Sequence, residues 1–270
     1  MNTAYNYQKS ENRGTIRKSL LALLMMKNKL IFVLTFLISV VIVRIIMIRF
    51  FIDISPIVVA IAFLLILRDK FSDLSLRLFN PLSFIAIILI TYVLLFLTIS
   101  IQSYFKFSEF SFTSDKGKII GYFLSAIIMC GFTEETAWRG YLFSKLKDLT
   151  WFQITIIINL IWAIWHIPSH FYVLEGHIWI SFPLFIVSCF ELGIIMQYLR
   201  VKTDSVIPCI LFHALFIFPL MLSGLETKVL YLGSFPYIIM LLLLLPLTIY
   251  CYRAGQRIHE EQNNKAQQAV

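Results

Sequence analysis

The chain has 270 residues, of which 59% are hydrophobic and only 14% are charged. An ordinary soluble domain carries roughly 25% charged residues, so this composition excludes a disordered chain and argues against a water-soluble globule. The chain holds more apolar side chains than one core of this length can bury, which predicts that many of them face lipid. The net charge of +8 is then explained by orientation in a membrane, and no nucleic-acid partner is expected.

Two polar segments flank the apolar part of the chain. Residues 1–29 are predicted to form a basic cytoplasmic segment without a removable signal peptide, and the stretch from Thr15 to Met26 suits a helix lying along the inner membrane surface. Residues 30–252 form one predicted membrane domain, and residues 253–270 form a polar cytoplasmic tail.

Apolar stretches near the roughly 20-residue length of a membrane-spanning helix recur between charged, Pro or Gly breaks. They predict an all-α fold, a polytopic transmembrane bundle of about eight helices. The predicted spans are Leu30–Ile48, Ile54–Leu67, Pro81–Ile101, Ile119–Gly140, Trp151–Ile167, Ile178–Leu199, Val206–Leu222 and Tyr231–Tyr252.

Lysine and arginine orient these spans. Seventeen of the 23 Lys and Arg residues fall in the termini and alternate loops of one side, five fall on the other side, and Arg44 falls inside the first span. Because cytoplasmic loops are enriched in Lys and Arg, both termini are predicted to be cytoplasmic. If the short second span were not a true span, every later loop would lie on the opposite side of the membrane. Lys and Arg would then no longer be concentrated on one side.

Several ionisable side chains fall inside the predicted spans, where a charge costs on the order of 3 kcal/mol. The fourth span carries Glu134, Glu135 and Arg139, the fifth carries His166, and the seventh carries His213. In a helical bundle these side chains would meet in one polar pocket. Taken singly, each also has a structural interpretation, as an interfacial charge or as a histidine in a helix-packing contact.

The spacing of these side chains predicts separate roles. Glu135 and Arg139 are four residues apart, which favours an ion pair on a helix. Glu134 is rotated by about 100° from its neighbour and is left outside that pair. It could act as a general base toward water, while His166 and His213 position the water or stabilise an oxyanion.

Metal binding is a second interpretation of the same side chains. Glu134, His166 and His213 could each supply one ligand to a divalent ion such as zinc. His166 and His170 form another candidate pair, although Pro168 between them would bend or end the helix. A mechanism without metal uses the same residues, so both interpretations stay open.

Glu191 in the sixth span is expected to neutralise Arg44 or Arg139, or to donate a hydrogen bond as a neutral acid. A proton-coupled transporter that uses Glu134, Glu191 and the histidines as a relay is therefore a further candidate function.

In their order and spacing these residues resemble the CAAX-protease and bacteriocin-processing (CPBP, or Abi) family of intramembrane proteases. The family's EExxxR motif is matched by Glu134, Glu135 and Arg139, its aromatic-xxx-His motif by Trp162 and His166, and the first position of its HxxxN motif by His213. Trp162 stands where Phe is usual, and Ile217 stands where Asn is usual. The stretch from Leu199 to Pro208 is similar to the loop before the last motif.

The resemblance implies a protease-like core over residues 119–222 and an intramembrane endopeptidase, most simply in a bacterial cytoplasmic membrane. It implies that Glu134 activates the attacking water with help from His166, that His213 lies on the oxyanion side, and that Glu135 and Arg139 organise the helix. The family is catalogued as metalloproteases. Implied substrates are membrane-associated, such as a prenylated C-terminus, a bacteriocin or signalling-peptide precursor, or an anti-sigma-like protein. A non-catalytic bacteriocin-immunity or regulatory protein of the same fold is the alternative, which the missing Asn favours.

Depth along the helices sets a condition on this pocket. At about 1.5 Å per residue, Glu134 lies about 22 Å from the outer start of its span and His166 about 22 Å from the inner start of the next. Ideal antiparallel spans would therefore place them near opposite faces. Tilt, or a fifth helix that starts well inside the cytoplasm, would bring them together in the inner half of the membrane, in a pocket open to the cytoplasm.

Overall fold

The computed structural model describes residues 27–47, 54–104, 113–168, 178–223 and 234–268. The chain comprises two compact units, Met1–Ser39 and Val40–Val270, and the site described below lies within the second. Secondary structure in the described ranges is helical, without strands, which confirms the predicted all-α class there. The helix predicted from Thr15 to Met26 lies outside the described residues.

Each of the eight predicted spans coincides with an apolar helix. Five helices are long and apolar enough to cross a membrane, and they fall at Lys27–Met47, Phe84–Ile101, Lys116–Leu146, Phe182–Thr203 and Ile238–Gln268. Three shorter apolar helices occupy Ser55–Ile66, Trp151–Trp165 and Ile207–Leu222. The chain is thus a multi-pass membrane protein, while the number of crossings and the side on which the termini lie stay predictions.

The second unit contains a long helical path interrupted by π-helical turns. In chain order its elements are α2 (Ser55–Ile66), η2 (Phe71–Leu74), α3 (Pro81–Tyr104), α4 (Lys116–Ser125), η3 (Ala126–Phe132), α5 (Thr133–Glu135), η4 (Thr136–Leu142), α6 (Phe143–Leu146), α7 (Trp151–Trp165), α9 (Ile178–Thr203), α10 (Ile207–Ser223) and α12 (Ser234–Gln268). The elements from α4 to α6 form one continuous path, in which η3 and η4 are π-helical.

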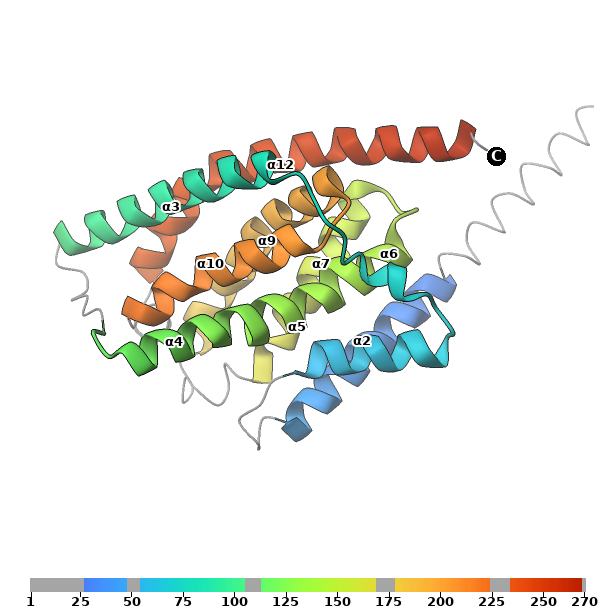
Figure 1. Cartoon of the computed structure of the whole chain (residues 1–270), viewed down its shortest axis with the longest axis horizontal. Helices are drawn as coiled ribbons and strands as arrows, with labels where there is room; N and C mark the ends of the chain where they lie inside the picture. Colours follow the sequence, from blue (N-terminus) through green and yellow to red (C-terminus); the bar gives the residue numbers. More distant parts are fainter. Residues whose placement is uncertain (1–26, 48–53, 105–112, 169–177, 224–233, 269–270) are drawn as a thin grey trace, which may run out of the picture. The chain divides into compact units, whose positions relative to one another are not determined.

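Helix α9 lies among several other helices of this unit. It packs against α12, α7 and α10, and α10 packs in turn against η3 (Figure 1). Its side chains at Ile195, Met196 and Leu199 have at most 1% of their surface exposed. Because α7, α9, α10 and the α4–α6 path pack around one another, polar side chains on these helices can be sheltered from lipid.

Glycines allow two of these helix contacts to be close. A Cβ on Gly131 of η3 would lie 2.6 Å from the carbonyl oxygen of Ile210 in α10. A Cβ on Gly193 of α9 would lie 1.9 Å from Oδ1 of Asn159 in α7. Small residues at such positions let membrane helices approach closely, so both glycines fix the spacing of the helices around the site.

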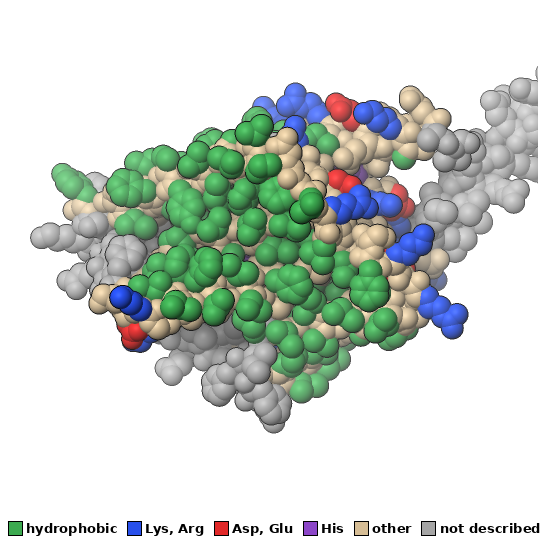
Figure 2. All heavy atoms as spheres, in the orientation of Figure 1, with side chains coloured by type: hydrophobic (Ala, Val, Ile, Leu, Met, Phe, Trp, Pro, Cys, Tyr) green, Lys and Arg blue, Asp and Glu red, His purple; other side chains and the backbone are tan. Residues whose placement is uncertain are grey.

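The outer surface matches a bilayer. Figure 2 shows one face covered with hydrophobic side chains, with most Lys, Arg, Asp and Glu side chains gathered toward its ends. On α3, for example, Leu82 and Phe96 have 72% and 69% of their surface exposed. Apolar side chains exposed in this way are stable when they face lipid.

The predicted polar tail is helical where it is described. Helix α12 continues past Tyr252 as far as Gln268. The ring of His259 is buried in this extension, and its Nε2 donates a hydrogen bond to the carbonyl of Leu149 at 2.9 Å. The tail therefore packs on the connection between α6 and α7.

Candidate active site

The two adjacent glutamates lie in a short α-helical turn between π-helical stretches. Glu134 and Glu135 belong to α5, and Arg139 belongs to η4. All three side chains are buried. Isolated π-helical turns are rare and often mark functional sites, because they change which residues share a helix face.

Arg139 is held by contacts from three helices. Its Nη1 lies 3.1 Å from both carboxylate oxygens of Glu135, which is the ion pair expected from the spacing of four residues. Its Nη2 donates to Oδ1 of Asn159 in α7 at 2.9 Å, and its main-chain carbonyl accepts from Nε of Arg200 in α9 at 3.0 Å. A buried ion pair needs such additional hydrogen bonds to offset the loss of water.

Glu135 also positions a histidine. Nδ1 of His213 in α10 lies 2.8 Å from Oε1 of Glu135. Because the Glu135 carboxylate pairs with Arg139 and accepts hydrogen bonds, Nδ1 carries the proton and Nε2 is the acceptor nitrogen of the neutral ring. Glu135 therefore joins the arginine clamp to the imidazole, a link that the sequence motifs did not predict.

Glu134 is held separately by a tryptophan. Its Oε2 accepts a hydrogen bond from the indole Nε1 of Trp162 in α7 at 2.7 Å. The same indole makes edge contacts with His166 and His213, with ring centroids 5.8 and 5.4 Å apart. Its ring centroid lies 4.6 Å from Cζ of Arg139. Trp162 thus contacts four of the five predicted site residues.

Sequence reasoning missed the importance of Trp162. It placed the residue only as the aromatic position of a motif, not among the candidate catalytic residues. The sequence did contain an indication of its role, because Trp stands where the family usually has Phe. An indole N–H can donate a hydrogen bond and a phenyl ring cannot.

His166 lies at the C-terminal end of α7. Its Nδ1 lies 2.9 Å from the carbonyl oxygen of Trp162, so Nδ1 is the donor and Nε2 the acceptor of the neutral ring. The ring is half-buried and packs edge-on against Trp165 and Phe185, with centroids 4.6 and 4.9 Å apart. These contacts fix the ring at the end of the helix.

The depth problem is resolved by a longer fourth helix. The predicted end at Gly140 is wrong, because the helical path continues to Leu146. Glu134 then lies about 18 Å from that end, and Trp162 lies about 17 Å from the start of α7 at Trp151. The two residues are at the same level, and His166 lies one helical turn farther along.

The metal interpretation finds no support in the described residues. No group of three His, Cys, Asp or Glu side chains lies close enough there to hold a metal ion. Within the three-ligand set, both histidines are held at Nδ1, so these hydrogen bonds leave their Nε2 atoms as acceptors. The pair with His170 lies outside the described residues. Glu134, His166 and His213 are thus not gathered around one point in this arrangement.

The expected ion pair of Glu191 with Arg44 or Arg139 is not formed. Arg139 is neutralised by Glu135, and Arg44 donates to the carbonyl of Trp165 and stacks on its ring at 3.6 Å. Glu191 is buried in α9, makes no ion pair with a described residue, and its Oε2 has no hydrogen-bond partner there. Each arginine therefore makes its polar contact with a residue other than Glu191.

Comparison with protein families gives one match. Residues 116–218 match the family described as type II CAAX prenyl endopeptidase, Rce1-like. The matched range begins with α4, ends within α10, and contains all five predicted site residues, which confirms the predicted resemblance. No curated protein matches the chain.

Proposed function

We propose that this chain, whose residues 116–218 match the family described as type II CAAX prenyl endopeptidase, Rce1-like, is an intramembrane peptidase that hydrolyses a membrane-associated peptide or protein. The observation that carries this proposal is the cluster in which the indole of Trp162 joins the carboxylate of Glu134 to the rings of His166 and His213. A membrane helix bundle has no structural need for such a cluster, since each polar group in lipid is costly.

Glu134 is the proposed general base. It is the carboxylate outside the Arg139 ion pair, and its single described hydrogen bond comes from Trp162. It takes a proton from water while the water oxygen attacks the carbonyl carbon of the scissile amide. When the tetrahedral intermediate collapses, the C–N bond breaks and the proton held by Glu134 passes to the leaving amine.

The two histidines have proposed roles that follow from their fixed tautomers. His166 presents Nε2 to the attacking water and orients it by accepting a hydrogen bond. His213, held at Nδ1 by Glu135, donates from Nε2 to the oxyanion once that nitrogen is protonated. In the catalytic triad of serine proteases a carboxylate fixes the tautomer and orientation of a histidine in the same way.

Ile217 bears on the alternative function. It follows His213 by one helical turn in α10, where the family motif has Asn. The side chain of Ile217 cannot donate a hydrogen bond to an oxyanion. His213 must therefore stabilise the oxyanion without a neighbouring Asn. A non-catalytic relative of the same fold would also tolerate this change, and the experiment below separates the two.

The test is peptide cleavage by the full chain in lipid vesicles. A panel of peptides with prenylated and unprenylated C-termini is incubated with wild type and with Glu134→Gln, and products are identified by mass spectrometry. We expect Glu134→Gln to lower the cleavage rate by about 10²-fold or more, the usual contribution of a general base. Glu191→Gln, a change at another buried carboxyl, is the matched control and should cleave normally.

Three results would contradict the proposal. Unchanged cleavage by Glu134→Gln would remove the proposed base. Tight peptide binding without cleavage by wild type would favour the non-catalytic relative. Proton-linked solute flux that Glu191→Gln abolishes would favour the transporter. The proposal also places the protein in a bacterial cytoplasmic membrane, with a membrane-associated peptide or protein as its natural substrate.

A further inference from the structure

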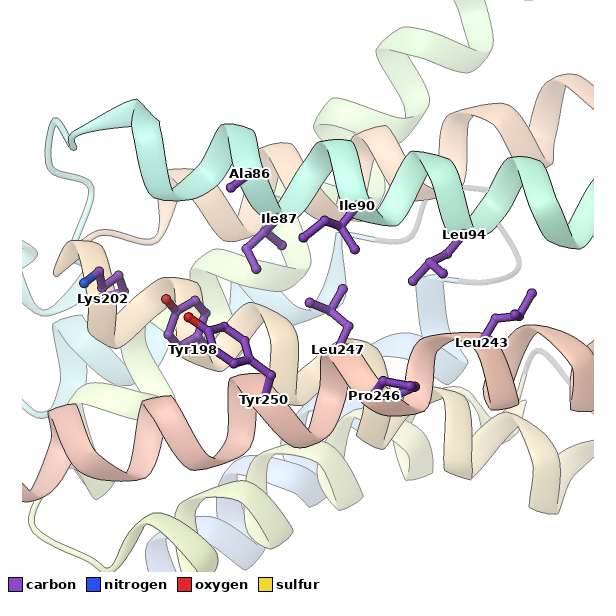
Figure 3. Close-up of a pocket in the computed structure, with 10 residues that line it drawn as sticks. All are labelled: Ala86, Ile87, Ile90, Leu94, Tyr198, Lys202, Leu243, Pro246, Leu247 and Tyr250. Atoms are coloured by element: carbon purple, nitrogen blue, oxygen red, sulfur yellow. The ribbon is translucent and has the colours of Figure 1, made fainter.

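A groove of about 650 Å³ lies between α3, α9 and α12, on helices that carry none of the proposed catalytic residues (Figure 3). Most of its wall is aliphatic and comes from Ala86, Ile87, Ile90 and Leu94 of α3 and from Leu243, Pro246 and Leu247 of α12. Three residues with polar groups complete it, namely Tyr198, Lys202 and Tyr250. Its volume lies within the roughly 300–1,000 Å³ of small-molecule sites.

The polar groups gather at one end of the groove. Figure 3 shows Lys202 and the two tyrosines at one end, and Leu94 and Leu243 at the other. The rings of Tyr198 and Tyr250 pack edge to face with centroids 6.1 Å apart, and Lys202 is exposed at the C-terminal end of α9. The groove is therefore amphipathic along its length.

The aliphatic part can hold a segment of a hydrocarbon chain. From Ile87 to Leu94 the wall extends over two turns of α3, about 10 Å. Ala86 and Pro246 have short side chains and leave the space open between the facing helices. An open apolar groove of this kind matches a lipid tail better than a polar solute.

Headgroup chemistry decides which lipid would be preferred. An acyl chain gains little on moving from the bilayer to an apolar groove, because lipid tails are as apolar as Leu. Selectivity must then come from the end that carries Lys202. A lysine ammonium binds phosphate as a point charge, and a tyrosine hydroxyl can donate to its oxygens.

The predicted orientation places this end at the inner leaflet. Lys202 belongs to the segment between the sixth and seventh predicted spans, which the Lys and Arg distribution assigns to the cytoplasm. The cytoplasmic leaflet carries the anionic lipids, and basic pockets between helices on that side bind their headgroups.

We propose that the groove between α3, α9 and α12 binds one anionic phospholipid of the inner leaflet. Its phosphate lies against the ammonium of Lys202 and the hydroxyls of Tyr198 and Tyr250, and one acyl chain lies along α3 and α12. The site is separate from the peptidase proposal, because it uses none of the catalytic residues.

The experiment measures lipid retained by the full chain. The protein is placed in nanodiscs that contain equal amounts of phosphatidylglycerol and phosphatidylcholine with the same acyl chains, and is then analysed by native mass spectrometry. Wild type should retain phosphatidylglycerol in excess. Lys202→Gln should lower the ratio of the two lipids about fivefold, the effect of one lysine near an anionic headgroup.

A matched control and a groove-filling variant complete the test. Lys147→Gln removes another exposed lysine, outside the groove, and should leave the ratio unchanged. Ile90→Trp should reduce the retention of both lipids while the thermal unfolding curve shows that the protein is folded. Equal retention of both lipids by wild type, or no effect of Lys202→Gln, would overturn the proposal. Retention of soluble glycerol phosphate as strong as that of the lipid would reveal a phosphate site instead.

Discussion

The indole N–H of Trp162 and the carboxylate of Glu134 are 2.7 Å apart, and this hydrogen bond joins α7 to α5 inside the bundle. It engages Oε2 of Glu134 and so fixes the orientation of the carboxylate. The same ring packs edge-on against both histidines of the site. One tryptophan thus holds the proposed base and sets its position relative to the two imidazoles.

Replacing Trp162 with Phe tests this role. The change keeps an aromatic ring and removes the N–H donor, so Glu134 should lose its fixed orientation while the packing is largely kept. A hydrogen bond to a charged group contributes roughly 1.5–3 kcal/mol. We expect kcat for peptide cleavage to fall about tenfold or more with little change in KM, as measured with the vesicle assay.

The control for this prediction is another buried tryptophan. Nε1 of Trp151 has no hydrogen-bond partner within the described residues, so Trp151→Phe makes the same chemical change without removing a bond. It should keep kcat near the wild-type value. An equal loss in both variants would mean that Trp162 acts through packing alone.

Arg139 provides a prediction about stability. Removal of one partner from a buried ion pair costs about 3–5 kcal/mol, because a charge is left without compensation. Arg139→Met should therefore lower the thermal unfolding temperature in detergent strongly. The double variant Glu135→Gln/Arg139→Met leaves no such charge and should be more stable than the sum of the single changes implies. Additive effects would show that the pair is not coupled.

Helix periodicity predicted the local features of this site but not the contacts between helices. The spacing of Glu135 and Arg139 was enough to predict their ion pair, because both residues lie on one helix. The bond from His213 to Glu135 joins residues 78 positions apart, and no local pattern encodes it.

Helix ends were predicted well where the helix ends at the boundary between an apolar and a polar stretch of sequence. The start of α7 at Trp151 was predicted correctly, and Thr150 before it caps the helix. Hydropathy ended the fourth span at Gly140, because Arg139 precedes that glycine. In the fold this arginine is neutralised inside the bundle, so the helix continues to Leu146. Tertiary contacts thus overrode the polarity of a single residue.

Gly193 is predicted to be essential for the approach of α9 to α7. A Cβ there would lie 1.9 Å from Oδ1 of Asn159 and 2.7 Å from Nη2 of Arg139, which would separate the two groups that hydrogen-bond to each other. Overpacking of this kind costs typically 1–3 kcal/mol. We expect Gly193→Ala to lower both the unfolding temperature and the cleavage rate.

A glycine in open space serves as the control. Gly121 in α4 has no atom within 4 Å of an added Cβ, so Gly121→Ala should be neutral or slightly stabilising. Removal of the clashing amide in Gly193→Ala/Asn159→Ala should recover part of the stability lost in the single glycine variant. A Gly193→Ala protein as stable as wild type would show that the helices separate at little cost.

Asp69 lies after α2, outside the predicted spans, and ties that connection to the end of the fourth helix. Its carboxylate accepts from the hydroxyl of Tyr141 at 2.7 Å and pairs with Nζ of Lys145 at 2.5 Å. Burial raises the pKa of Asp69, but the hydrogen bonds from Lys145 and Tyr141 and the charge of Lys145 outweigh it. The pKa therefore lies below its ordinary value of 3.8.

A lowered pKa in the folded state stabilises the protein above pH 3.8, and this contribution is lost as the pH falls through the folded value. Asp69→Asn should thus be less stable than wild type near pH 6, and the difference should shrink as the pH approaches 3. Tyr141→Phe removes one of the hydrogen bonds that lower the pKa of Asp69. In the Tyr141→Phe background, the effect of Asp69→Asn on stability should therefore change less with pH. The measurement is thermal unfolding in detergent across this range. If wild type and Asp69→Asn differ in stability by the same amount at low and at high pH, the negative charge of Asp69 contributes no stability. The two proteins would then differ only in packing.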